Sequence, residues 1–287
     1  MTFNEFALAN EPAIRLAAFF GVFTLMATWE TAAPRRVRLH SRRQRWTSNL
    51  GLVMLNSLLL RLVFPLAAVG FAAFAAERDW GLINNLTLPP WAALVLAVVA
   101  LDFAIYLQHV MFHAVPALWR LHRVHHADPD FDVTTGARFH PIEIVLSMLI
   151  KLSVIAVLGA PAAAVLVFEV LLNATAMFNH ANVKLPAGID AALRLLLVTP
   201  DMHRVHHSTD VAEANSNFGF NLPWWDRLFG TYRAAAQHPQ EGMAIGVQGL
   251  TGDPRCLSLV GMLALPFLDA GREYAIGHAV EVKHEAP

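Results

Sequence analysis

Long apolar stretches separated by short polar segments dominate the chain. The first runs from about Ala13 to Thr28, the second from Leu50 to Ala76 and the third from Trp91 to about Met111. A bilayer-spanning helix needs about 20 mainly apolar residues, so each stretch predicts a transmembrane helix. No basic segment precedes the first stretch and no small-residue cleavage site follows it before the charges begin, which predicts a retained anchor and not a removed signal peptide.

A fourth apolar stretch, from Ile144 to Phe178, is about 35 residues long and is interrupted by Gly159-Ala160-Pro161. It is too long for one span and has turn residues at its middle, so it predicts a hairpin of two helices. The run from Leu257 to Leu268 is too short to span and is expected at the interface or against the bundle. The fold predicted is an all-α, polytopic membrane bundle of about three spans plus a helical hairpin.

A strongly basic segment follows the first apolar stretch. Six arginines lie within residues 34–45, between the first two predicted spans. The positive-inside rule places this segment in the cytoplasm and the N-terminus outside. Counting the crossings then places residues 112–143, and everything after His180, on the cytoplasmic side as a helical cap.

The composition agrees with a membrane protein and narrows its chemistry. Of 287 residues, 56% are hydrophobic and 15% are charged, whereas a soluble domain has about a quarter charged residues. The 21 Lys and Arg are balanced by 22 Asp and Glu, so no nucleic-acid partner is expected. The single Cys256 excludes a disulfide framework, a cysteine zinc site and a cysteine-ligated iron–sulfur cluster.

Histidine is unusually frequent for so apolar a chain, and eight of the fourteen lie in three clusters. His109 and His113 are four residues apart, and the pentapeptide His-Arg-Val-His-His occurs at 122–126 and again at 203–207. On a helix, residues four apart share a face, whereas the fourth residue of each pentapeptide is rotated about 100° from the fifth. Each pentapeptide is therefore predicted to supply ligands to two neighbouring metals.

Eight clustered imidazoles without a metal would lack acceptors and would repel one another when protonated. A metal ion binds the neutral imidazole and removes both problems. Eight ligands exceed the three or four of a single zinc site, which indicates two metals. Imidazole suits iron, zinc, copper and nickel, so the ligand type alone does not name the metal.

Acidic residues near the clusters are candidates for orienting the imidazoles through their second ring nitrogen. They are Asp128, Asp132, Asp201 and Asp210, together with Asp102 two turns before His109. Arg123 and Arg204, inside the two pentapeptides, are expected to pair with these acids or with lipid headgroups.

With their flanking motifs, the clusters resemble the fatty acid hydroxylase and sterol desaturase superfamily of integral membrane di-iron oxygenases. The flanking motifs are Arg138-Phe139-His140-Pro141-Ile142-Glu143, Asn179-His180-Ala181-Asn182, and Asn215-Ser216-Asn217-Phe218-Gly219 leading into residues 225–232. The resemblance covers roughly residues 90–235. It implies a site for two irons, O2 as co-substrate, and attack on an unreactive C–H bond of a lipid.

The metal ligands that the resemblance implies are nine histidines: His109, His113, His122, His125, His126, His180, His203, His206 and His207. Some members have a further histidine four residues before the one matching His180, but Ala176 stands there in this chain. Water or another ligand such as His140 could fill that place. His140 and Asn217 are otherwise expected just outside the ligands, and His40, His238, His278 and His284 are expected to have no role.

The activity implied is an oxidoreductase that hydroxylates or desaturates a lipid, with its site on the cytoplasmic face. The chain has no haem-attachment motif and no dinucleotide fingerprint, so electrons are expected from a separate ferredoxin- or cytochrome-type protein and its reductase. The expected division is N-terminal helices and basic loop (1–90), catalytic domain (91–235) and C-terminal cytoplasmic or interfacial segment (236–287).

Two other functions stay open at this point. A zinc-dependent membrane hydrolase would use a metal-bound water, although the chain lacks the His-Glu-x-x-His general base. A metal transporter or sensor would use the histidines as a binding site, although it would be expected to place ionisable residues along the spans as a path.

Overall fold

The computed structural model describes residues 3–276, and the regular structure in that range is helical. The α-helices are α1 (Phe3–Ala9), α2 (Glu11–Ala32), α3 (Arg42–Val63), α4 (Ala67–Ala76), α5 (Pro90–Ala114), α6 (Pro116–His126), α7 (Pro141–Leu158), α8 (Ala162–Asn179), α9 (Ala187–Leu193), α10 (Pro200–His206), α11 (Val211–Ala214), α12 (Trp224–Phe229) and α13 (Leu259–Ala264). Short 3-10 turns are η1 (Ile83–Asn85), η2 (Thr135–Ala137), η3 (Pro254–Leu257), η4 (Leu265–Phe267) and η5 (Arg272–Tyr274). Residues 277–287, with His278, His284 and the end of the expected C-terminal segment, lie outside the described residues.

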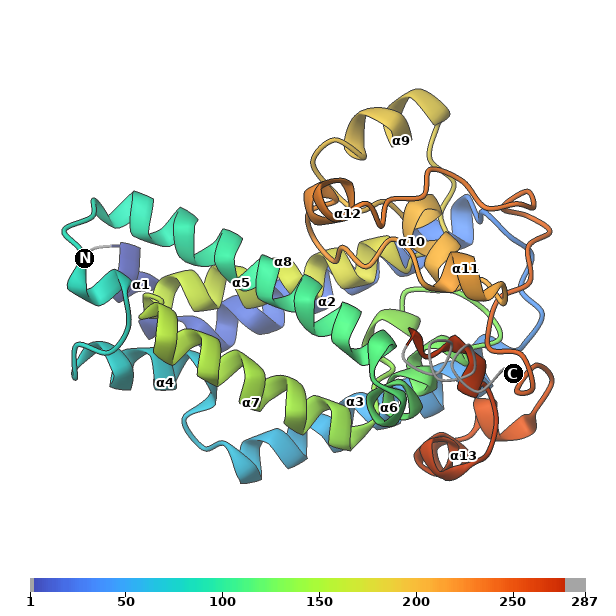
Figure 1. Ribbon diagram of the computed structural model, residues 1–287, viewed down its shortest axis with the longest axis horizontal. Helices are drawn as coiled ribbons and strands as arrows, with labels where there is room; N and C mark the ends of the chain where they lie inside the picture. The colour runs from blue at the N-terminus through green and yellow to red at the C-terminus, as the bar shows by residue number, and fades with distance from the viewer. Residues whose placement is uncertain (1–2, 277–287) are drawn as a thin grey trace, which may run out of the picture.

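Five helical stretches of the described chain are long and apolar enough to cross a membrane: α2, α3 with α4, α5, α7 and α8. They run along the long axis of the molecule in Figure 1. Large apolar side chains such as Phe20, Met54 and Val157 point outward with 60% or more of their surface exposed. Lipid covers such a surface favourably and water does not. The chain is therefore a multi-pass membrane protein with the predicted three spans plus a hairpin.

The hairpin between α7 and α8 turns at Gly159, as the sequence predicts. Gly159 has φ of +67° and ends α7, and Pro161 precedes α8. The preceding turn, between α4 and α5, packs on it through Gly81, whose φ is +86°. A Cβ on Gly81 would lie 2.1 Å from the backbone nitrogen of Gly159, so this close approach requires glycine. The second predicted span is kinked at Pro65, between α3 and α4, because proline interrupts helical hydrogen bonding.

Charges inside the bundle are paired with one another. The buried carboxylate of Glu169 on α8 accepts a hydrogen bond of 2.6 Å from Lys151 Nζ on α7. The same carboxylate is paired with Arg15 on α2. A carboxylate between two cations is far less costly in an apolar interior than a lone charge, so this network ties three spans together.

The rest of the chain packs as a helical cap at one end of the bundle, where α5 ends and α6 and α10 begin (Figure 1). The run from Leu257 to Leu268 forms part of this cap and packs against α3 and α6, as expected. Arg123 on α6 donates to the carbonyl oxygens of Leu265 and Leu268, at 2.5 and 2.6 Å. This corrects the expectation that Arg123 pairs with an acid or a headgroup, since it anchors the C-terminal segment through backbone oxygens.

Candidate metal centre

All nine histidines of the implied ligand set are buried at the junction of bundle and cap. They fall into two groups, and in each group one ring nitrogen of every residue lies within 4.8 Å of the others. The five-histidine group is His109, His113, His122, His126 and His206. The four-histidine group is His125, His180, His203 and His207.

Helical spacing divides each pentapeptide between the two groups, as the sequence predicts. His122 and His126 share the five-histidine group, and His125 between them belongs to the other. In the second pentapeptide the ends, His203 and His207, share the four-histidine group, whereas His206 belongs to the five-histidine group. Each pentapeptide therefore contributes to both groups.

A turn at Val115 brings the first two clusters together. Helix α5 ends at Ala114, Val115 is extended, and Pro116 starts α6, which packs against α5. The Nε2 atoms of His109 and His122 then lie 3.1 Å apart, and those of His113 and His126 also 3.1 Å apart.

The third cluster and the end of α8 complete the arrangement. His180, the residue that caps α8, places its Nε2 3.1 Å from the Nε2 atoms of both His125 and His203. The Nε2 of His206 on α10 lies 3.0 Å from that of His109. The Nε2 atoms therefore converge from four helices.

Burial keeps these imidazoles neutral. Desolvation lowers the pKa of His122 and of His180 to about 3, and it holds the pKa of His125, His126 and His207 well below the ordinary value. A neutral imidazole has one nitrogen with a free lone pair, which is the form that binds a metal ion.

Hydrogen bonds at Nδ1 fix which nitrogen carries the proton in five of the nine rings. The acceptors are oxygens: Phe218 O for His109 (2.8 Å), Asn215 Oδ1 for His113 (3.0 Å), Glu143 Oε1 for His122 (2.7 Å), Ser216 O for His206 (2.7 Å) and Ala176 O for His180 (2.8 Å). Because each partner accepts, Nδ1 donates and Nε2 keeps its lone pair toward the other histidines.

The two groups differ in how many of their histidines have a hydrogen-bond partner at Nδ1. In the five-histidine group only His126 lacks an Nδ1 partner among the described residues. In the four-histidine group only His180 has one, since Nδ1 of His125, His203 and His207 has none, and neither has Nε2 of His207. The Nε2 lone pairs of His109, His122 and His206 face one another at 3.0–3.1 Å, and Nε2 of His207 has no partner within the described chain. Buried lone pairs without a donor cost free energy, and metal ions bound at Nε2 would remove that cost. The donor set therefore fits two metal ions.

Phenylalanine rings surround the histidines. Phe139 stacks on His125 with ring centroids 4.5 Å apart, and Phe131 lies over His180 and His207 at 5.3 and 5.0 Å. Phe218 packs on the rings of the five-histidine group. These apolar walls exclude water, which strengthens electrostatic interactions inside the centre. Sequence reasoning assigned them no role.

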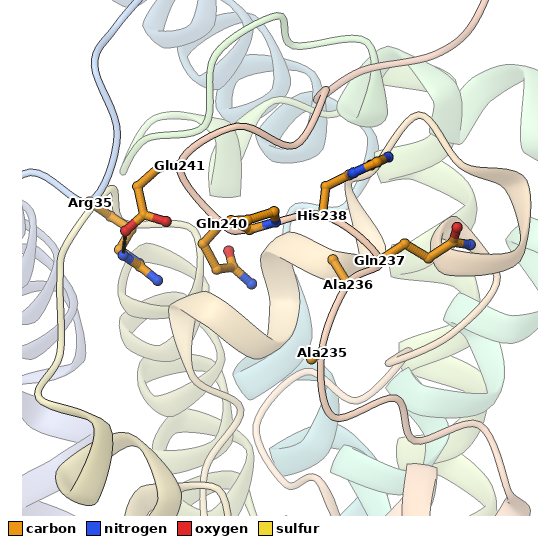
Figure 2. A pocket seen from close by; sticks show the side chains of 8 residues that line it. Arg35, Ala235, Ala236, Gln237, His238, Gln240 and Glu241 are labelled. Carbon is orange, nitrogen blue, oxygen red and sulfur yellow. Dashed lines mark hydrogen bonds and ion pairs between the residues drawn. The ribbon is translucent and has the colours of Figure 1, made fainter.

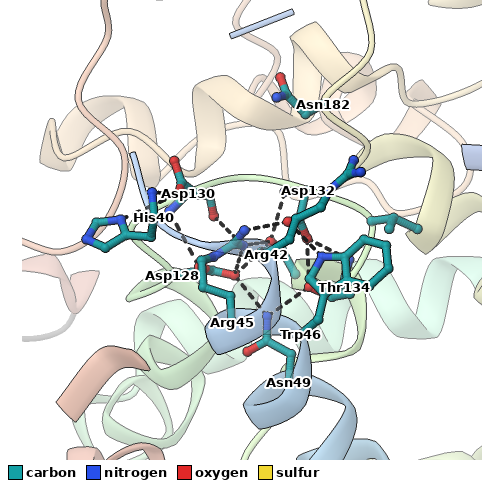
Figure 3. Close-up of polar contacts among 12 residues, drawn as sticks. His40, Arg42, Arg45, Trp46, Asn49, Asp128, Asp130, Asp132, Thr134 and Asn182 are labelled. Atoms are coloured by element: carbon teal, nitrogen blue, oxygen red, sulfur yellow. Dashed lines mark hydrogen bonds and ion pairs between the residues drawn. The ribbon is translucent and has the colours of Figure 1, made fainter. Parts of the chain in front are cut away.

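The acids predicted to orient the histidines have other partners. Asp128 and Asp132 both bind the buried guanidinium of Arg45, and Asp128 does so at 2.7 Å (Figure 3). Asp201 pairs with Arg204 at 2.5 Å, as was expected for this arginine. Within the described residues, these three form no hydrogen bond with a histidine of either group, because each neutralises an arginine instead.

The other residues that were predicted to lie next to the histidines form helix caps and hydrogen bonds with the surrounding fold instead. Asp210 caps α11 by accepting from Glu213 N at 3.0 Å, and His140 caps α7 by accepting from Ile142 N at 3.2 Å. Asn217 has φ of +53° and donates to Met202 O, while Asp102 accepts from Trp225 Nε1 at 2.7 Å. His140 belongs to neither histidine group.

Two residues that the flanking motifs contain, but to which sequence reasoning assigned no role, contact the centre directly, namely Glu143 and Asn215. Glu143 is 3% exposed at the start of an apolar helix. The sequence did indicate a special role for Glu143, since a carboxylate at the start of a predicted span needs a partner. Asn215 begins a flanking motif, but its contact with His113 depends on a loop that folds back over α5.

The surface pocket in Figure 2 is separate from the centre. Its volume is about 380 Å³, and it is lined by Arg35 and residues 235–241. His238 lines it, but the nine histidines do not.

Comparison with known proteins agrees with the centre. Residues 94–231, which contain all nine histidines, match the family described as Fatty acid hydroxylase. The chain is 33% identical to ornithine lipid hydroxylase OlsE of Rhizobium tropici over 183 residues, which is 64% of this chain and 53% of that protein. It is 31% identical to alkylglycerol monooxygenase of Homo sapiens over 141 residues, which is 48% of this chain and 30% of that protein.

The chain thus spans about half the length of the first relative and less of the second. It is also 30% identical to very-long-chain aldehyde decarbonylase GL1-1 of Oryza sativa subsp. indica, over 63% of this chain and 30% of that protein. No solved structure matches significantly. Residues 94–231, which hold the histidine centre, are the part of the chain that matches the fatty acid hydroxylase family.

Proposed function

We propose that this protein is a membrane-embedded oxygenase that uses two irons and O2 to hydroxylate or desaturate a C–H bond of a lipid. The observation that carries the proposal is the pair of buried, neutral histidine groups at the end of a membrane bundle. Two relatives, an ornithine lipid hydroxylase and an alkylglycerol monooxygenase, support the same reaction class.

The nine histidines would hold one iron in each group. Bound iron would supply oxygen activation and redox chemistry, which zinc lacks. The chain itself contributes three things. The acceptors at Nδ1, such as Glu143 and Asn215, orient the rings; burial keeps the imidazoles deprotonated at Nε2; and the phenylalanines keep water away.

The electron balance requires a separate donor. Hydroxylation converts a C–H bond, O2, two electrons and two protons into an alcohol and water, and desaturation with the same inputs yields an alkene and two waters. We propose a ferredoxin- or cytochrome-type protein with its reductase as the source, because the chain has no haem-attachment motif or dinucleotide fingerprint.

We further propose that the centre faces the cytoplasm. The segment 34–45, with its six arginines, lies at the same end of the bundle as the histidines, and the positive-inside rule assigns that end to the cytoplasm. The division into 1–90, 91–235 and 236–287 stays a prediction, with the family match inside the second part.

The test combines metal analysis with isotope labelling. Purified protein is expected to contain about two irons per chain, as the two groups imply. Membranes supplied with electrons and 18O2 are expected to yield a lipid that gains one labelled oxygen, or that loses two hydrogens. Product formation without O2 would favour the hydrolase, and metal flux without oxygen consumption would favour the transporter; either result would overturn the proposal.

A further inference from the structure

Two segments of the cap expose large apolar side chains next to one another. Between 44% and 70% of the surface of each residue is exposed, in a set that we name the α9–α12 patch: Ile189, Leu195, Leu196, Trp224, Leu228 and Phe229. The sequence predicts that all six lie at the cytoplasmic side of the membrane. Water is an unfavourable neighbour for so many large exposed apolar side chains.

Hydrogen bonds make the two segments one unit. Trp224 Nε1 donates to Leu195 O at 2.7 Å, and Arg227 Nη2 donates to Arg194 O at 3.1 Å. Arg194 in turn donates to Ala234 O at 2.6 Å, beyond the end of α12. The patch is therefore a fixed surface and not a set of independent loops.

This unit packs against the side of α5. The ring of Phe229 lies 5.8 Å from that of Phe103 and 5.6 Å from that of Tyr106, and Trp225 lies 4.7 Å from Phe103. Trp225 also donates to Asp102 at 2.7 Å. In Figure 1, α12 lies alongside the second half of α5 and not beyond its end.

The contacts with α5 fix the depth of α12 in the membrane. Trp91, 71% exposed, stands at the other end of α5, where interfacial aromatics belong. At 1.5 Å per residue, Phe103 lies about 18 Å and Tyr106 about 22 Å from Trp91 along the helix. The hydrocarbon core is about 30 Å thick, so both rings lie inside it. Side chains stacked on these rings must lie there too.

We propose that the α9–α12 patch is inserted into the membrane leaflet next to the cap and is covered by lipid acyl chains. Arg227 is exposed at its rim and is placed to reach lipid phosphates with its charged end, whereas Arg194 is paired with Asp190 at 2.7 Å. The patch is also connected to the metal centre. Asp226 on α12 accepts from the backbone nitrogens of Phe218 and Gly219 at 2.8 Å, and Phe218 O binds His109 Nδ1.

The test places an environment-sensitive NBD fluorophore on single introduced cysteines in the full chain, reconstituted in phosphatidylcholine vesicles. The variants are Leu228→Cys and Leu195→Cys in the patch, Leu62→Cys on α3 as a lipid-facing control, and His238→Cys as a water-facing control. The native Cys256 does not interfere, because it is buried and burial raises the pKa of its thiol to about 11.

We expect blue-shifted emission at both patch positions and loss of that emission when doxyl-labelled phosphatidylcholine is added, as at Leu62→Cys. The doxyl group near the headgroup end of the acyl chain should quench more than one near the chain terminus. Red-shifted, unquenched emission like that of His238→Cys would overturn the proposal. Blue-shifted emission that doxyl lipids do not quench would also overturn it, since that result means that protein, such as a second copy, covers the patch.

Discussion

The Nδ1–H of His122 donates to the carboxylate of Glu143 across 2.7 Å, and both side chains are buried. A carboxylate at this position orients the imidazole and increases its basicity as a ligand. The other described Nδ1 hydrogen bonds of the nine histidines have a carbonyl or amide oxygen as acceptor, and only this one has a carboxylate. It makes the five-histidine group electrostatically different from the four-histidine group.

Replacing Glu143 tests that relationship. Glu143→Ala should weaken iron binding by about 10- to 100-fold, as is usual when a residue behind a metal-binding histidine is lost. Glu143→Gln keeps a hydrogen-bond acceptor but no charge, so its iron affinity should lie between that of Glu143→Ala and that of the unaltered chain. Iron titration of purified protein measures the effect, with exposed Glu241→Ala as the control. Iron binding by Glu143→Ala equal to that of the unaltered chain would contradict the role.

Removal of one histidine from each group should abolish turnover. His206→Ala removes a nitrogen from the five-histidine group, and His125→Ala removes one from the four-histidine group. We expect both variants to remain in the membrane, to lose iron and to form no oxidised lipid, whereas His238→Ala should behave as the unaltered chain. Iron analysis and lipid mass spectrometry check this. Full activity in either of the first two variants would remove that residue from the ligand set.

The metal-free protein should lose stability in acid. Burial lowers the pKa of His122 and His180 to about 3, whereas the unfolded chain protonates histidine near pH 6.5. Between these values the unfolded state binds protons that the folded state excludes, so the free energy of unfolding falls as the pH falls from 7 toward 4. Thermal unfolding in detergent at pH 7 and pH 5 measures the change. A midpoint that does not fall between these pH values would contradict it.

Arg45 should matter more for stability than other arginines in the basic segment. Its guanidinium is fully buried and neutralises Asp128 and Asp132 (Figure 3). Arg45→Leu leaves the buried Asp132 without its cation and Asp128 with only Arg138 at 3.8 Å, and such a loss typically costs about 3–5 kcal/mol. Arg43→Ala, on the same helix but exposed, is the matched control. Equal unfolding midpoints for the two variants would show that the buried network is unimportant.

The turn at Gly159 offers a matched glycine pair. Gly159→Ala would strain a backbone with φ of +67° and place a Cβ 2.6 Å from Trp80 O, which should cost at least about 1 kcal/mol. A Cβ on Gly21, inside α2, would meet no atom within 4 Å, so Gly21→Ala should be neutral or slightly stabilising. Thermal unfolding of both variants in detergent compares them. A Gly159→Ala protein as stable as Gly21→Ala would contradict the strain.

The spans, the hairpin and the division of each histidine pentapeptide between two groups could all be predicted from the amino-acid sequence. These features depend on local properties, since the length of an apolar run and the 100° rotation between successive helical residues are the same in any fold. His122 and His126 therefore had to share a face, and His125 had to point away from it.

Only the tertiary structure decided which partners meet. The turn at Val115 and Pro116 packs α6 against α5, and the loop at 215–218 brings Asn215 and Phe218 O to the histidines. The acids that are close to the histidine clusters in the sequence pair with arginines in the structure. The reason is that a buried guanidinium such as that of Arg45 requires a carboxylate partner more strongly than a neutral imidazole does. Such competition depends on distances between residues far apart in the chain, and no local pattern encodes it.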